Sequence, residues 1–311
     1  MNRRPVIIDC DPGIDDAVAL LLAFRAPELD VRAVTPVAGN VGLENTTRNA
    51  LRIAALAGVE VPVCPGAARP MFGALVSAEE VHGADGMMGL PLPEPTFQPS
   101  GELAWDALYR EAKACGGELE VVATGPLTNL GVAFSKYRDL PGLLRRIVLM
   151  GGAACYGNTT PAAEFNMLAD PEAAEIVFRS GVPVCMCGLD VTHRAYLTPE
   201  EIADLAGQGT PQAEFAAKVM DSAIEWHQRL FGVPGAPMHD ACAMMYALEE
   251  ELFTSTRCWV GVECQGRITR GKTVTDLYSD AKREANTDLV TDVDRKKFVR
   301  SLQNRMLAYR S

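Results

Sequence analysis

Four carboxylates lie within eight residues near the start of the chain, in the stretch Asp9-Cys10-Asp11-Pro12-Gly13-Ile14-Asp15-Asp16. The apolar run before Asp9 is typical of a buried strand, and the residues after Asp16 favour a helix. Pro12-Gly13 predicts a sharp turn that brings the two pairs of carboxylates together. Such groups repel one another unless protons or a cation compensate their charge, and hard divalent cations prefer oxygen ligands. The cluster therefore indicates a metal site.

Two other interpretations of this cluster stay open at this point. Asp15 could simply cap a helix while Asp9 or Asp11 is solvated. An Asp-x-Asp pair after an apolar strand also opens Mg²⁺-dependent phosphatases of the haloacid dehalogenase type. Those enzymes usually continue with Gly-Thr/Val-Leu, whereas this chain continues with Pro12-Gly13. A persuasive later Lys with a Thr or Ser, which a phosphatase needs, is missing from the pattern.

Apolar strand-like runs alternate with helical segments along the first two thirds of the chain. The predicted strands are Pro5–Asp9, Val31–Ala38, Val61–Cys64, Leu119–Ala123, Arg146–Met150 and Pro183–Gly188. The predicted helices are Asp16–Arg25, Leu43–Ala57, Glu102–Ala114, Leu127–Tyr137, Pro171–Arg179 and Glu200–Ala206. Nearly continuous apolar strands separated by helices predict an α/β fold with an open, mostly parallel central sheet flanked by helices. Ligands of such sheets bind outside the carboxyl ends of the strands, where the acidic cluster lies.

Two segments interrupt this alternation. Met71–Pro99, rich in Pro and Gly, predicts a long loop, which is usually functional or mobile. Pro211–Phe231 predicts a long amphipathic helix. The tail returns to strands at Arg257–Glu263 and Lys272–Asp276 and ends in a helix near Asp294–Tyr309, so the sheet is mixed. No linker divides the chain, and we expect residues 1–311 to form one domain of the Rossmann type.

Composition limits the classes of partner. The chain has 311 residues and a net charge of −11, from 29 basic and 40 acidic residues. A chain this acidic is unsuited to binding nucleic acid or an anionic membrane surface, which needs a basic face. No apolar run reaches the roughly 18 residues of a membrane span. The nine scattered cysteines and the absence of a signal-peptide pattern predict a cytoplasmic protein.

The opening motif resembles that of the inosine–uridine preferring nucleoside hydrolase family, Asp-Thr-Asp-Pro-Gly-x-Asp-Asp, with Cys10 in place of Thr. The likeness extends in order over nearly the whole chain. The matching segments are Val37-Ala38-Gly39-Asn40, Thr124-Gly125-Pro126-Leu127-Thr128-Asn129, Met150-Gly151-Gly152, Gly157-Asn158, Ala163-Glu164-Phe165-Asn166, Asp170-Pro171-Glu172-Ala173-Ala174, Gly188-Leu189-Asp190-Val191-Thr192-His193 and His239-Asp240-Ala241. The resemblance implies a nucleoside-hydrolase fold and hydrolysis of the N-glycosidic bond of ribonucleosides.

The resemblance also implies a Ca²⁺ cofactor. Its ligands would be Asp11, Asp16, the backbone carbonyl of Thr124 and Asp240, an all-oxygen set that suits calcium. Asp11 is expected to act as the general base on a calcium-bound water. Asp15 is expected to accept a hydrogen bond from a ribose hydroxyl, and Asp9 to orient neighbouring groups from behind the site.

Four further positions match the ribose-binding residues of the family. They are Asn40, Asn158, Glu164 and Asn166, whose amides and carboxylate can hold hydroxyls as donors or acceptors. Phe165 lies between two of them and could pack against sugar or base, or in the core.

Two histidines are candidates to assist the departing base. His239 directly precedes the expected ligand Asp240, and the resemblance makes it the candidate acid. His82 in the long loop matches a second histidine of the pyrimidine-preferring branch, so it too is a candidate catalytic residue. His227 and Phe231, four residues apart on one helical face, are expected to border the base.

These residues favour a ribonucleoside hydrolase that acts on pyrimidine ribosides such as uridine and cytidine. A broad inosine–uridine hydrolase is the close alternative. The Mg²⁺-dependent phosphatase and a non-catalytic nucleoside- or ribose-binding protein are the alternatives from other classes. By analogy with the family we expect a homo-oligomer, a dimer or a tetramer.

Overall fold

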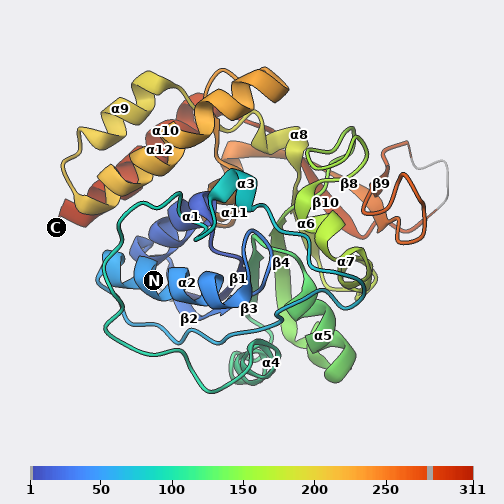
Figure 1. Cartoon of the computed structure of the whole chain (residues 1–311). Helices are drawn as coiled ribbons and strands as arrows, with labels where there is room; N and C mark the ends of the chain where they lie inside the picture. Colours follow the sequence, from blue (N-terminus) through green and yellow to red (C-terminus); the bar gives the residue numbers. More distant parts are fainter. Residues whose placement is uncertain (1–2, 279–282, 311) are drawn as a thin grey trace.

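The computed structural model describes residues 3–278 and 283–310, apart from the side chain of Trp226. Its centre is an eight-stranded sheet in the order β2-β1-β3-β4-β5-β10-β8-β9 (Figure 1). The strands are β1 (Arg4–Cys10), β2 (Leu29–Pro36), β3 (Leu119–Ala123), β4 (Leu144–Met150), β5 (Val184–Cys187), β8 (Phe253–Val262), β9 (Thr273–Asp276) and β10 (Thr287–Val293). All pairs from β2 to β10 are parallel, and β8 and β9 join antiparallel. A separate antiparallel pair joins β6 (Tyr196–Leu197) to β7 (Ala236–Pro237).

Helices cover both faces of the sheet. They are α1 (Ile14–Arg25), α2 (Leu43–Ala57), α3 (Glu79–His82), α4 (Ala104–Ala114), α5 (Thr128–Lys136), α6 (Phe165–Ala169), α7 (Pro171–Phe178), α8 (Leu189–Thr192), α9 (Pro199–Ala206), α10 (Pro211–Phe231), α11 (His239–Leu248) and α12 (Arg295–Leu307). Short 3₁₀ turns are η1 (Leu140–Leu143), η2 (Glu250–Leu252) and η3 (Ala308–Arg310).

The alternation of side chains along β1 explains the two layers. Ile8 and Cys10 enter a core shared with α1, α2, α10, α11 and α12, whereas Ile7 enters the core under α4, α5 and α7. Successive side chains of a strand point to opposite faces, so a strand buried on both sides is apolar at nearly every position. The prediction of an α/β fold with an open, mostly parallel mixed sheet is confirmed.

One predicted strand is wrong. The segment Val61–Cys64 contributes only an isolated parallel bridge, Val63 to Val34. Pro62 of this segment and Pro36 of β2 have no N–H to donate, so one hydrogen bond of a regular ladder is missing on each side of the bridge.

Among the elements that sequence reasoning missed are one strand of the central sheet, β10, and one long helix, α11. β10 carries Thr and Asp between its apolar residues and reads as polar, yet it is the strand that joins the parallel and antiparallel parts of the sheet. Helix α11 begins at His239, and nine of its ten residues are buried. Because it is apolar on all sides except at its first two residues, it lacks the amphipathic pattern by which surface helices are found.

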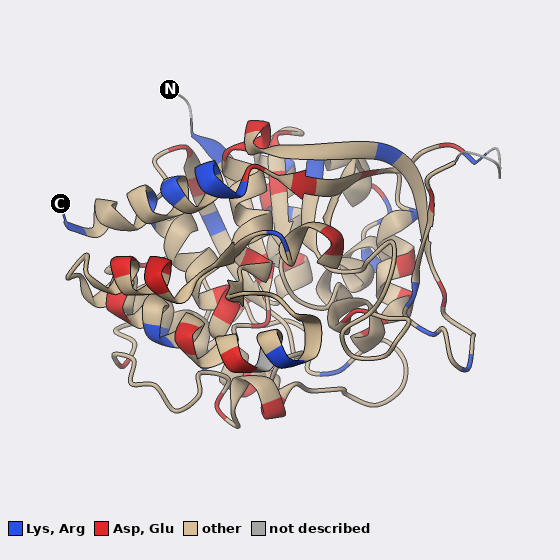
Figure 2. Cartoon of the chain, turned by 90° about the horizontal axis from the view of Figure 1, so that it is seen from above, with Lys and Arg blue, Asp and Glu red and all other residues tan. Residues whose placement is uncertain are grey.

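Charges of both signs are interspersed over the described elements (Figure 2). None of the described helices has the length and apolar character needed to cross a bilayer.

Candidate active site

Asp11 follows the carboxyl end of β1 and is 1% exposed. The backbone N–H of Asn40 donates to its Oδ2 at 2.7 Å. A Cβ on Gly39 would lie 2.1 Å from the same oxygen, and one on Gly125 would lie 2.7 Å from Oδ1. The two glycines therefore let backbone from β2 and β3 close around this carboxylate.

Asp16 lies in the first turn of α1 and is fully buried. Its Oδ2 accepts the N–H of Gly13 at 3.0 Å, and its Oδ1 accepts the hydroxyl of Thr124 at 2.8 Å. The amide of Asn40 bridges the turn, donating to the carbonyl of Asp11 at 3.1 Å and to Asp16 Oδ2 at 3.3 Å. The amino terminus of α1 thus binds one oxygen of the Asp16 carboxylate, and Thr124, which follows β3, binds the other.

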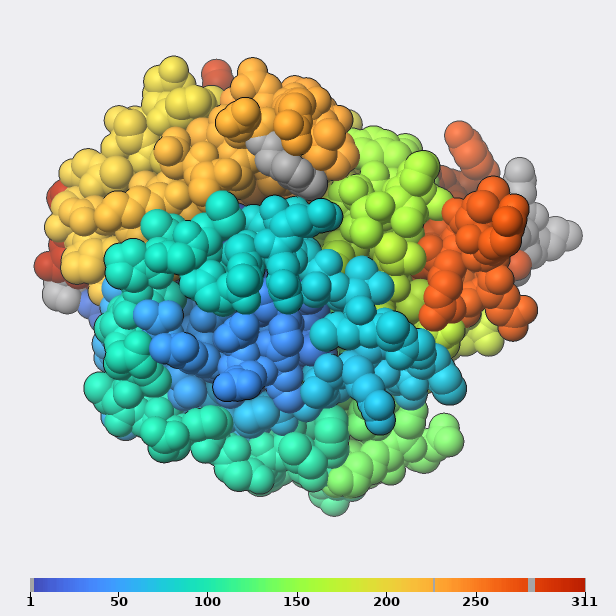
Figure 3. All heavy atoms as spheres, in the orientation of Figure 1, coloured from blue at the N-terminus to red at the C-terminus, as the bar shows by residue number. Residues whose placement is uncertain are grey.

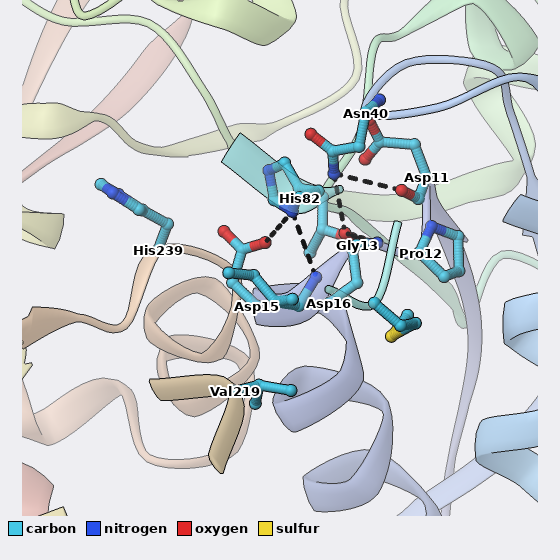
Figure 4. Close-up of polar contacts among 12 residues, drawn as sticks. Asp11, Pro12, Gly13, Asp15, Asp16, Asn40, His82, Val219 and His239 are labelled. Atoms are coloured by element: carbon cyan, nitrogen blue, oxygen red, sulfur yellow. Dashed lines mark hydrogen bonds and ion pairs between the residues drawn. The ribbon is translucent and has the colours of Figure 1, made fainter. Parts of the chain in front are cut away.

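The acidic cluster also recruits a residue from the far end of the chain. Asp240 enters at the start of α11, and one carboxylate oxygen each from Asp15, Asp16 and Asp240 lie within 4.8 Å of one another. Figure 4 shows Asp11, Asp15 and Asp16 around the start of α1. The end of β1 and the starts of α1 and α11 therefore bring four carboxylates together, of which all but Asp15 are buried.

Burial and mutual repulsion disfavour the charged forms of these groups. Burial, with the nearby Asp16 charge, raises the pKa of Asp11 well above its usual range, and burial with the Asp15 charge does the same to the pKa of Asp240. Burial, followed by the Asp15 charge, raises the pKa of Asp16 to about 6. Among the described residues no Lys or Arg forms an ion pair with any member of the cluster, so its charge lacks a compensating group from the chain.

The cluster fits a hard divalent cation. Asp11 Oδ1 and Asp15 Oδ1 are buried and have no hydrogen-bond partner among the described residues. Buried carboxylate oxygens are costly to leave unpaired, and an ion with oxygen ligands would satisfy both. The Thr124 carbonyl lies at the same edge, where it accepts the amide of Asn166 at 2.8 Å.

A cavity opens directly above the cluster. It is lined by eleven of the predicted residues, namely Asp15, Asn40, His82, Thr124, Asn158, Glu164, Phe165, Asn166, His227, His239 and Asp240. Asp11 and Asp16 are buried beneath it and do not belong to its lining. Phe231 is also outside the lining, and its ring lies 5.1 Å from that of His193.

Two of the predicted ribose ligands also shape the loop before α6. Glu164 caps this helix and accepts the N–H groups of Asn166 at 3.0 Å, Met167 at 3.2 Å and Gly152 at 2.8 Å. Burial raises the pKa of Glu164 to about 7. Asn158 Oδ1 accepts the N–H of Phe165 at 2.9 Å, so its amide group is left to donate.

His82 reaches the site from the long 71–99 segment. This segment contains only the single turn α3 and lies over the amino-terminal part of the molecule, in cyan to teal in Figure 3. The N–H of Ile14 donates to His82 Nδ1 at 3.2 Å, and Asp15 Oδ1 lies 4.0 Å from the same nitrogen. Burial lowers the pKa of His82 to about 4. His82 is therefore neutral at neutral pH, with its proton on Nε2.

Asp9 points away from the other three carboxylates of the opening motif. Its Oδ2 accepts the hydroxyl of Thr35 at 2.6 Å and the amide of Asn129 at 2.9 Å. Asp9 therefore ties β1 to β2 and α5, on the face of the sheet that Ile7 also enters.

Sequence reasoning missed ten of the residues that line the cavity. From the 71–99 segment these are Ser77, Ala78, Glu80 and Val81, and from elsewhere Ile14, Met150, Thr159, Met220, Ala223 and Pro237. Met220 and Ala223 precede His227 by seven and four residues, which places the three on one face of α10. That spacing was available in the sequence, whereas the loop residues carried no periodic signal.

Comparison with known proteins identifies the family. Residues 6–300 match the family model described as inosine-uridine preferring nucleoside hydrolase. The chain belongs to this family.

Its relatives resemble it over their full length. The pyrimidine-specific ribonucleoside hydrolase RihA of Photobacterium profundum is 46% identical over 308 residues, covering 98% of this chain and 99% of that protein. The protein of the same name from Escherichia coli K12 is 44% identical over 307 residues, with the same coverage. Among solved structures, a plant nucleoside hydrolase and a purine-preferring ribonucleoside hydrolase from Gardnerella vaginalis each superpose with a TM-score of 0.92 at 32% identity, covering 99% of this chain and all of theirs.

This membership decides between the enzyme classes left open by the sequence. The family hydrolyses nucleosides, so the prediction of a ribonucleoside N-glycosidase is confirmed and the phosphatase alternative is discarded.

Proposed function

We propose that this family member hydrolyses pyrimidine ribonucleosides, uridine and cytidine, to free base and ribose with the aid of Ca²⁺. The observation that supports the proposal is the cavity, whose walls carry amides and imidazoles next to a carboxylate cluster that has no Lys or Arg partner among the described residues. The pyrimidine preference is supported by the names of the two bacterial relatives.

Calcium would be held by Asp11, Asp16, Asp240 and the carbonyl of Thr124, with Asp15 at its margin. A bound divalent cation lowers the pKa of a coordinated water and so supplies a nucleophile at neutral pH. Asp11 would accept the proton of the attacking water through Oδ1, because its Oδ2 is engaged by Asn40.

The ribose would lie between the cluster and the loop before α6. Asp15 would accept from a ribose hydroxyl, and the amides of Asn158 and Asn166 would bind the others. Asn40 and Glu164 line the same wall, where their hydrogen bonds hold the turn and the α6 cap rigid. Phe165 would cover the apolar edge of the substrate.

The departing base would face the imidazoles. His239 would donate a hydrogen bond to the base as the glycosidic bond breaks, which stabilises the negative charge that develops there. His82 Nδ1 accepts from α1, so only its Nε2 can donate to substrate. His227 would border the base, and Phe231 would support that wall from outside the cavity.

A broad inosine–uridine activity is the second candidate. It is favoured by the family description and by the 0.92 TM-score to a purine-preferring hydrolase. A binding protein without turnover is the third possible outcome of a test.

A substrate panel tests these alternatives. Purified protein is incubated with uridine, cytidine, inosine or adenosine, and released ribose is measured before chelation, after EDTA and after Ca²⁺ is restored. We expect release from uridine and cytidine, its loss with EDTA and its recovery with Ca²⁺. Comparable release from inosine would favour the broad enzyme, and tight binding without ribose release would favour the binding protein.

We also propose that residues 1–311 act as one domain, that the protein is cytoplasmic and that it forms a homodimer or homotetramer. The first is supported by strands from both ends of the chain in one sheet, and the second by nine free cysteines. Sedimentation velocity would measure the oligomeric state.

A further inference from the structure

A chain of hydrogen bonds joins two histidines on the base side of the cavity. His239 starts α11 and is 9% exposed, and His227 lies on the last turns of α10 and is 6% exposed. Their Nε2 atoms are 3.3 Å apart. The other nitrogen of His239, Nδ1, lies 2.8 Å from the hydroxyl oxygen of Thr192, at the end of α8. Figure 4 shows His239 on the side of Asp15 away from Asp11.

The position of the His227 proton follows from its other partner. His227 Nδ1 lies 2.8 Å from the carbonyl oxygen of Ala223, one turn earlier in α10. A carbonyl oxygen can only accept, so Nδ1 must carry the hydrogen. Burial lowers the pKa of His227, which favours the neutral ring. In a neutral imidazole with its proton on Nδ1, Nε2 is an acceptor.

The His239 proton is then fixed in turn. Two nitrogen lone pairs at 3.3 Å would repel each other, so His239 Nε2 must donate to His227 Nε2. His239 Nδ1 is left to accept from Thr192. The threonine hydroxyl cannot make this choice, because a hydroxyl both donates and accepts.

We propose that His227 is a positioning residue that holds His239 in the tautomer with its hydrogen on Nε2, the nitrogen that faces His227. This inference rests on the proposed function of His239 as hydrogen-bond donor to the departing base. In this proposal His227 acts on the reaction by fixing the proton of His239, in addition to any contact with the base. A base acceptor that approaches Nε2 would then find a hydrogen on that atom and would compete with His227 Nε2 for it.

The tautomer is measured directly by solid-state ¹⁵N NMR of protein labelled at histidine, a method that tolerates a large oligomer. The chain has four histidines, so single substitutions assign each signal. In the wild-type protein we expect His239 to be protonated on Nε2 and His227 on Nδ1. Signals showing His239 protonated on Nδ1 would overturn the proposal without any variant.

Two variants separate the partners of His239. His227→Phe keeps a ring but removes the acceptor, and we expect His239 to become a mixture of tautomers. His193→Phe is the matched control, because the His193 ring packs 5.5 Å from that of His239 with no hydrogen bond between them. The control is expected to leave the His239 signal unchanged. An unchanged His239 signal in His227→Phe would contradict the proposal.

Kinetics give a second, independent measurement. In His227→Phe we expect kcat for uridine to fall by about tenfold to hundredfold, because a misplaced proton disables the donor. An aryl riboside with a good leaving group should keep kcat within about twofold, because it needs little help from a donor. A rise in KM for uridine with unchanged kcat would instead assign His227 a base-contact role and overturn the proposal. Wild-type protein with the expected tautomer but no activity on any nucleoside would refute the proposed function and leave the tautomer assignment intact.

Discussion

Buried acids lie at both ends of the parallel strands, and the chain treats them in opposite ways. At the amino ends, Glu120 of β3 is 1% exposed and meets three arginines. Arg4 lies 3.1 Å from its carboxylate, Arg146 3.3 Å and Arg145 3.5 Å. At the carboxyl ends, the cluster of Asp11, Asp15, Asp16 and Asp240 meets no Lys or Arg among the described residues.

This difference separates a structural acid from a functional one. A buried carboxylate with its cations in place is already compensated, and removing it leaves those cations unpaired. A cluster without cations is destabilising by itself and is explained by something that binds there. The following substitutions therefore have opposite expected effects on stability and activity at the two ends.

The largest effect is expected from Asp11→Asn. Loss of the base and of a metal ligand should lower kcat on uridine by about 10²–10⁴-fold. Asparagine keeps an oxygen that can accept from Asn40, and it removes an uncompensated charge. The metal-free variant should therefore unfold at the same or a higher urea concentration than wild type. If the metal-free variant unfolds at a lower urea concentration than wild type, Asp11 is a structural acid like Glu120.

Glu120→Gln tests the other end. It should lower the free energy of unfolding by about 3 kcal/mol, because it leaves partly buried arginines without their shared partner. Activity per folded molecule should be unchanged, because Glu120 lies at the amino ends of the strands and the acidic cluster lies at their carboxyl ends. Glu118→Gln is the control, because its pair with Arg145 is exposed and is worth about 0–1 kcal/mol. Equal losses in the two variants, measured by urea titration, would contradict the comparison.

Calcium should substitute for the missing cations. At a concentration 100 times its dissociation constant it should raise the free energy of unfolding by about 2.7 kcal/mol. Glu120→Gln should retain this increase, whereas Asp16→Asn should lose most of it. Urea titrations in calcium and in EDTA measure both. The same increase in Asp16→Asn would show that calcium binds elsewhere.

The smallest effect is expected from packing around Asp11. In Gly125→Ala the new Cβ would lie 2.7 Å from Asp11 Oδ1 and 2.9 Å from its backbone nitrogen, so the chain must shift. We expect a loss of about 1–3 kcal/mol in stability, together with weaker calcium binding measured by calorimetry. Gly42→Ala is the control, since nothing lies within 4 Å of its Cβ position and its φ is −62°. Unchanged calcium affinity in Gly125→Ala would show that calcium binding does not depend on the close contact between Gly125 and Asp11.

The sequence predicted the strands at Pro5–Asp9 and Leu119–Ala123 well because strands buried on both faces must be apolar throughout. It failed at Val61–Cys64, where two prolines limit pairing to one bridge. It also failed at β10, because this strand contains polar residues and lacks an apolar pattern. Its place in the sheet depends on pairing with β5 and β8 on its two sides.

For the site, the sequence located Asp11 and Asp16 because the Pro-Gly turn holds their spacing locally. It could not place Phe231 outside the cavity, because this depends on the direction of a side chain within a packed layer.

By itself, the sequence determined the alternation of strands and helices and the dense group of carboxylates at the first turn, because both depend on residues that are neighbours along the chain. The family resemblance implied that Asp240 joins this group, and the tertiary structure brings its carboxylate close to Asp15 and Asp16. Only the tertiary structure decided that His227 faces His239. Those pairings bring together elements far apart in sequence, and the hydrogen-bond direction between two imidazoles is set by the distances and partners that packing imposes on them.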